Sequence, residues 1–106
     1  MLMRNRLQPV AVFRAEETDG GYVGTVRVWH AHGTVLADVQ PTDGKREIAA
    51  YGARVTGMRT LYLPRDADIC PGDGVVGLDT HARPTWRVVQ VLDYSRHRVA
   101  LIEKAV

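Results

Sequence analysis

Two histidines that stand two positions apart are the first residues in this chain that could do chemistry. His30 and His32 would point to the same face of a β-strand, because side chains along a strand alternate between its faces. Such a pair supplies only part of a zinc site, which needs further ligands. The other candidate ligands stand at no recognisable metal-site spacing: His81, His97 and Cys70. The pattern therefore favours histidines at surface or turn positions over a metal centre.

Carboxylates recur over a short polar segment in the second half of the chain. Asp66, Asp68 and Asp73 resemble part of a calcium loop, but the glycine and the terminal glutamate of the helix-flanked motif are missing. We therefore predict that these three carboxylates are solvated and hold no calcium ion.

Cys70 is the only cysteine, so the chain forms no intrachain disulfide and a reducing compartment is expected. Because no neighbouring base or oxyanion donor supports a nucleophilic role, the residue is interpreted as a small buried hydrophobic side chain. A phosphate-binding loop, a nucleophile elbow and a pair of catalytic acids are also absent from the sequence. These observations predict a protein that is not an enzyme and needs no cofactor.

Aromatic residues spread along the chain allow a second kind of function. They are Tyr22, Trp29, Tyr62, Trp86 and Tyr94. On a small β-barrel such rings can form a platform on which nucleic-acid bases stack. Both tryptophans lie among valines, however, where burial of a large ring in a core or an interface is the ordinary outcome. Packing is the favoured interpretation, and a nucleic-acid-binding barrel is the alternative.

The composition indicates one domain that spans residues 1–106. Of these, 45% are hydrophobic and 25% are charged, the net charge is +2, and the isoelectric point is about 9.0. The tight basic groups are small, Arg4 with Arg6 and Arg96 with Arg98, whereas strong nucleic-acid binding usually needs a basic cluster. Polar residues interrupt the apolar stretch near the start, so neither a signal peptide nor a membrane span is expected. We expect a soluble protein of the cell interior.

Patterns typical of β-strands fill the first 40 positions. A strand is expected around 10–13, a second over 22–30 and a third over 34–40. Ala31-His32-Gly33 is interpreted as a tight turn that folds the second strand back onto the third, because glycine tolerates positive φ.

Four more strands are expected in the remainder of the chain, over 57–63, 75–78, 85–92 and 97–104. Positions 93–96 are predicted to form a hairpin loop between the last two strands. Both parities of the last strand are apolar, which predicts burial on both faces or cover by a neighbouring subunit. Short strands at this spacing favour a small, mostly antiparallel β-barrel of roughly five to seven strands.

The longest connection in this pattern is the insert, residues 41–56, between the expected strands 34–40 and 57–63. Most of it is polar and turn-forming, and Ile48 and Tyr51 are its candidate anchors to the core. Their spacing, with Gly52 behind them, allows one short helix over 45–51. Loops of this length in so small a domain are usually functional or disordered, so we expect the function of the chain to involve this insert.

The order of these patterns is similar to that of the head closure proteins of tailed bacteriophages, also called head-tail stoppers, and of the small minor capsid proteins grouped with them. Most of the chain takes part in the resemblance. The matching segments are Val35-Leu36-Ala37-Asp38-Val39-Gln40-Pro41, the polar insert, Ala50-Tyr51-Gly52, Arg59-Thr60-Leu61-Tyr62, Pro71-Gly72-Asp73 and Trp86-Arg87-Val88-Val89-Gln90-Val91-Leu92-Asp93-Tyr94. None of these segments is catalytic.

The resemblance implies a small β-barrel that assembles as a ring, often six-fold or twelve-fold, below the portal and adaptor of a DNA-filled capsid. In such proteins the long insert between the second and third barrel strands faces the central channel. Carried over here, the insert spans 42–54, and its channel or assembly residues are Asp43, Gly44, Lys45, Arg46, Glu47, Ile48 and Tyr51. The implied partners are further copies of the chain, portal or adaptor proteins, tail proteins and packaged DNA, with no membrane. The implied location is the virion, after assembly in the host cytoplasm.

Overall fold

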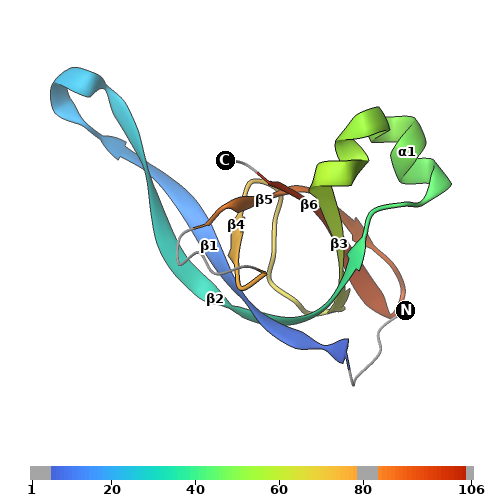
Figure 1. The fold of residues 1–106 in the computed structure, drawn as a ribbon. Coiled ribbons are helices and arrows are strands. Elements are labelled where there is room, and N and C mark those ends of the chain that lie inside the picture. The colour runs from blue at the N-terminus through green and yellow to red at the C-terminus, as the bar shows by residue number, and fades with distance from the viewer. Residues whose placement is uncertain (1–5, 79–83, 105–106) are drawn as a thin grey trace.

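A computed structural model describes residues 6–78 and 84–104 of the chain (Figure 1). The described part contains six strands: β1 (Gln8–Asp19), β2 (Thr25–Pro41), β3 (Met58–Pro64), β4 (Gly74–Val76), β5 (Trp86–Asp93) and β6 (His97–Lys104). Neighbouring strands are antiparallel throughout, and the order β1-β2-β3-β6-β5-β4 closes because β4 also pairs with β1. The predicted all-β barrel is confirmed. The barrel is closed by few residues on one side, since β4 is only three residues long.

The barrel interior is filled by one parity of most strands. Its buried side chains come from every strand and from the loop before β4. The largest fully buried ones are Val10, Val12, Leu61, Leu63, Ile69, Val75, Val88 and Ile102. Alternation along each strand places these residues on the inner face. Their burial removes apolar surface from water, which is the main force that closes so small a domain.

Strand β6 is buried on both faces, as its two apolar parities predict. Ala100 and Ile102 belong to the barrel interior, whereas Val99 and Leu101 join Met58 in a second cluster on the outer face. Tyr51 of the insert packs against this second cluster. The second face is therefore covered within the chain itself, and burial of β6 is no sign of a neighbouring subunit.

The predicted turn at 31–33 is wrong, because β2 runs without a break from Thr25 to Pro41. β2 pairs with β1 from Thr25 to Ala37, and the register slips once, where Val12 faces Gly33 and Phe13 faces Ala31. His32 is the extra residue of this β-bulge. A glycine inside a strand often marks a bulge. Gly33 therefore does mark an irregularity at this point of the chain, but the irregularity is a bulge and not a turn.

Because the chain does not turn at 31–33, strands β1 and β2 form a long hairpin that extends beyond the barrel. We call its distal part, residues 15–29, the arm; it is the blue and cyan ribbon that reaches away from the barrel in Figure 1. The chain reverses at 20–24, where Gly21 and Gly24 adopt φ angles of 68° and 80°. Side chains with a Cβ rarely adopt such angles, so both positions favour glycine. Tyr22 lies fully exposed at the tip.

The insert contains the predicted helix, α1 (Lys45–Tyr51), followed by a 3-10 helix over Gly52–Gly57. Gly52, with φ of 60°, ends α1 and donates its N–H to the carbonyl of Ile48. The hairpin loop between β5 and β6 is also confirmed, since the N–H of Tyr94 donates to the carbonyl of His97 over 2.9 Å. No helix among the described residues is long and apolar enough to cross a membrane.

Candidate functional site

The insert is fastened to the barrel at both of its ends. At the start, the hydroxyls of Thr42 and Thr60 lie 2.9 Å apart and both residues are buried. At the end of α1, the hydroxyl of Tyr51 donates to the side-chain carbonyl of Gln90 over 2.7 Å. The insert therefore projects from a braced base, with Tyr51 as an anchor, as the sequence predicts.

A two-pronged ion pair completes the base. The guanidinium of Arg54 donates to both carboxylate oxygens of Glu103 over 2.9 and 2.8 Å, and it lies 5.4 Å from the ring centre of Tyr51. The hydrogen bond from Arg54 is the main reason why the pKa of Glu103 is lowered, and the same bond raises the pKa of Arg54. Planar two-point pairing of this kind fixes orientation as well as distance.

The first half of the insert presents charges to solvent. Asp43, Lys45 and Arg46 are exposed, and within the described residues their side chains make no hydrogen bond or ion pair. Ile48, predicted as an anchor, is 47% exposed, so that expectation is wrong. The reason is that α1 faces the barrel through Tyr51, three positions further on. An apolar side chain and two cations are thus available to an outside partner.

Gly44 and Glu47 shape the beginning of α1. Gly44 is the residue before the helix, with extended backbone, and the Glu47 carboxylate fills the space that a Cβ at Gly44 would occupy. An acid in the first turn also complements the helix dipole. These two residues thus hold local structure, while their neighbours face outward.

A pocket of about 210 Å³ lies beneath the start of the insert. Its chemistry is set by two carboxylates from the insert and by aromatic rings from the barrel, namely Asp43, Glu47, Tyr62, Tyr94 and His97. The rings of Tyr94 and His97 stack with centroids 4.9 Å apart. Acids beside aromatic faces suit a cationic side chain. Sequence reading missed this pocket because its walls come from separate strands and a loop.

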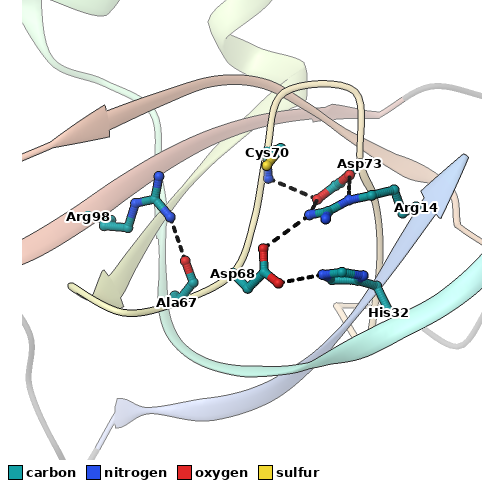
Figure 2. Close-up of polar contacts among 7 residues, drawn as sticks. All are labelled: Arg14, His32, Ala67, Asp68, Cys70, Asp73 and Arg98. Carbon is teal, nitrogen blue, oxygen red and sulfur yellow. Dashed lines mark hydrogen bonds and ion pairs between the residues drawn. The ribbon is translucent and has the colours of Figure 1, made fainter.

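A second polar cluster ties the root of the arm to the loop between β3 and β4 (Figure 2). Arg14 of β1 donates from Nε and Nη2 to the two oxygens of Asp73, over 3.0 and 2.9 Å. Asp73 is buried, and it also accepts the backbone N–H of Cys70. Asp68 lies between Arg14, at 3.3 Å, and His32, at 2.6 Å. The pair with Asp73 raises the pKa of Arg14, and the bond to His32, followed by that to Arg14, lowers the pKa of Asp68.

These contacts correct three expectations from the sequence. Asp68 and Asp73 are partners in ion pairs and not merely solvated carboxylates, whereas Asp66 is exposed. Cys70 is exposed, so the predicted burial is wrong. The reason is that Ile69 fills the core position beside it and the chain then turns at Pro71.

The two histidines of the candidate zinc pair have different carboxylate neighbours. His30 lies 3.2 Å from Glu16 on the arm, whereas His32 contacts Asp68. The bulge at His32 breaks the alternation that would have placed both imidazoles on one face. Residues 6–78 and 84–104 contain no group of three histidine, cysteine or acidic side chains placed to hold a metal ion. His81, one of the further candidates, lies outside the described residues.

The aromatic side chains are distributed over different parts of the molecule. Tyr22 lies at the arm tip, Trp86 is buried in the barrel, and Tyr62 belongs to the outer cluster under the insert. Arg59 lies 5.6 Å from the Trp86 ring, at the barrel end from which the insert leaves. A continuous stacking platform would need these rings side by side on one surface.

Comparison with known proteins identifies the fold and leaves the family open. No family model matches the chain, and no curated protein matches it. The solution structure of protein SF1141 from Shigella flexneri 2a is similar, with a TM-score of 0.68 over 95% of each chain at 15% sequence identity. At this identity the similarity shows a shared fold alone.

Proposed function

We propose that this chain is a structural virion protein of the head-tail connector, a head closure protein that forms a ring, joins head to tail and retains packaged DNA. The proposal starts from the resemblance of the strand order and is supported by the position of the insert. That insert leaves the barrel between β2 and β3, as the resemblance implies for a channel-facing loop.

The single observation that carries the proposal is the contrast between the braced base of the insert and its exposed charged residues. Its base is held by Thr42, Tyr51 and Arg54, while Asp43, Lys45 and Arg46 face solvent without partners among the described residues. A charged segment on a braced base suits contact between neighbouring copies in a ring, because each further contact becomes effectively intramolecular. Its cations also suit the phosphates of DNA in the channel.

The experiment that tests this function replaces side chains and keeps the insert in place. Deletion of 43–52 would remove Tyr51 and disturb the outer cluster, so we choose the triple variant Asp43→Ala, Lys45→Ala, Arg46→Ala. Among the described residues, these three exposed side chains make no hydrogen bond or ion pair. Particles with this variant are expected to lose packaged DNA or to lack tails. DNA content and electron micrographs of purified particles measure the outcome.

The control is Arg87→Ala, which removes an exposed arginine on β5 and leaves the insert unchanged. Control particles are expected to behave as wild type. If the triple variant also gave tailed particles with full DNA content, the insert would have no channel role and the proposal would be wrong.

A further inference from the structure

Most of the arm is exposed, and near its root the half-buried ring of Trp29 lies close to Gly74 of β4. β1 pairs with β4 only from Ala11 to Phe13, so from Ala15 outward each strand of the arm pairs only with the other. A two-stranded ribbon alone is at best marginally stable in water. An extension of this length therefore suits contact with another molecule.

One face of the arm carries two exposed valines and, beside them, an acidic residue. The register places Val26 opposite Thr18 and Val28 opposite Glu16, and directly opposed side chains lie on the same face of a sheet. The two valines are 37% and 38% exposed. Arg27 and Glu17 oppose each other on the reverse face. The arm thus offers one face on which the two valines occur together with the carboxylate of Glu16, which also lies 3.2 Å from His30.

The charges of the arm and the insert have opposite signs. The arm, residues 15–29, contains Glu16, Glu17 and Asp19 against Arg27, which gives 1 − 3 = −2. Residues 41–56 contain three cations and two acids, which gives 3 − 2 = +1. The exposed residues also correspond. Ile48 lies three positions after Lys45 and therefore on the same side of α1, much as the two valines share one face of the arm with Glu16.

The arm cannot reach the insert of its own chain. Figure 1 shows the two elements extending from opposite sides of the barrel. A contact between them must therefore join two molecules, and it uses a different surface on each. Such heterologous contacts, repeated from copy to copy, close into rings when the rotation permits.

We propose that the arm of one copy docks on α1 of a second copy of this chain, with Val26 and Val28 against Ile48 and with Glu16 facing Lys45, next to Arg46 in the first turn of α1. The inference rests on the proposed ring and deepens it by naming the surfaces that hold neighbours together. DNA is a poor occupant for the arm, because its acids would repel phosphates.

Cysteine cross-linking tests the contact directly. The native thiol is exposed and is first removed by Cys70→Ser. The variant with both Val28→Cys and Ile48→Cys is then treated with a short bifunctional thiol reagent. Head-to-tail docking gives a ladder of dimers, trimers and larger species on a denaturing gel. Either cysteine alone is expected to give only monomers.

A matched control separates docking from chance collision. Thr25 lies on the reverse face of the same arm, also exposed, so Thr25→Cys with Ile48→Cys is expected to give no ladder. Equal ladders from both pairs, dimers from Val28→Cys alone, or a chain that stays monomeric would each overturn the proposal.

Charge reversal supplies a second readout. Glu16→Lys, or Lys45→Glu with Arg46→Glu, is expected to weaken self-association about tenfold, since attraction becomes repulsion. All three changes together are expected to restore most of it, as measured by sedimentation. If the chain with all three charge reversals self-associates no more tightly than the chains with only one side reversed, the proposed pairing is contradicted.

These results remain separate from those for the connector function. If the alanine variant of the insert abolishes DNA retention while the chain with Val28→Cys and Ile48→Cys yields no arm-to-α1 cross-link, the connector role holds and the docking mode is wrong. A ladder together with normal particles from the insert variants would leave self-assembly intact and remove the connector role.

Discussion

At the scale of single residues, Asp73 has the most consequential position in the described chain. It is a buried carboxylate that accepts three hydrogen bonds, two from Arg14 and one from the backbone of Cys70. Through Arg14 it joins the root of the arm to the loop before β4, the short strand that closes the barrel. One side chain therefore couples closure of the barrel to the direction of the arm.

Replacement of this carboxylate is expected to destabilise the fold. Asp73→Ala leaves the guanidinium of Arg14 with only exposed Asp68 and the N–H of Cys70 without its acceptor. Because Arg14 is 35% exposed and stays partly hydrated, we expect a loss of about 1–3 kcal/mol in the free energy of unfolding, less than for a fully buried pair. Urea denaturation measures the loss.

The matched control is Asp66→Ala in the same loop. Asp66 is exposed and has no ion pair among the described residues, so its replacement is expected to change stability by less than about 0.5 kcal/mol. Equal effects of the two substitutions would show that Asp73 has no special role.

At the scale of elements, the arm and the insert behave differently because their bases differ. The insert returns to the barrel through Tyr51 and Arg54, whereas the arm is held at its root by the cluster around Arg14 and by the ring of Trp29 beside Gly74. A braced helix keeps a constant orientation, and a ribbon fixed at one end can adjust to a partner. The two elements are thus suited to serve as receptor and ligand of one contact.

The brace of the insert predicts a pH dependence of stability. The pKa of Glu103 is lowered by Arg54 from its ordinary value of 4.5. A carboxyl whose pKa is lower in the folded chain stabilises the fold above its unfolded pKa, and this contribution disappears as pH falls through the folded pKa. We therefore expect stability to fall as pH drops below about 4.5, and Arg54→Met to remove part of that fall.

Arg65→Met provides the control for loss of an arginine. Arg65 donates to the backbone carbonyls of Tyr94 and Ser95, which do not titrate. Urea midpoints between about pH 5 and pH 3 should therefore fall as steeply in this variant as in the wild type. Wild-type steepness in Arg54→Met would contradict the assigned role.

At the scale of the whole molecule, charge is distributed as compensated pairs. Arg14, Arg54 and Arg98 each lie against a carboxylate, and the net charge is only +2. The exposed cations of the insert are therefore few in one copy. A ring would repeat them around its axis, so assembly would create a basic surface that the monomer lacks.

This distribution predicts weak nucleic-acid binding by the isolated chain. Filter binding to duplex DNA at salt from about 50 to 200 mM is expected to show no tight complex, because few phosphates can be neutralised by one copy. Tight monomer binding that weakens steeply with salt would instead favour the alternative function, a nucleic-acid-binding barrel.

The sequence alone determines much of the local structure. Alternation predicts β3, β5 and β6, the spacing of Ile48, Tyr51 and Gly52 predicts α1, and the two apolar parities of β6 predict its double burial. All of these follow from neighbours within a few positions, where periodicity and turn chemistry act directly.

Only the tertiary structure decides which distant residues meet. His32 meets Asp68 across 36 positions and Arg14 meets Asp73 across 59. Pairing of β1 with residues 25–37 of β2 puts a bulge where a hairpin turn was expected at 31–33, and it extends the arm. The physical reason is that register is a collective property of two strands and a core, so no local pattern contains it.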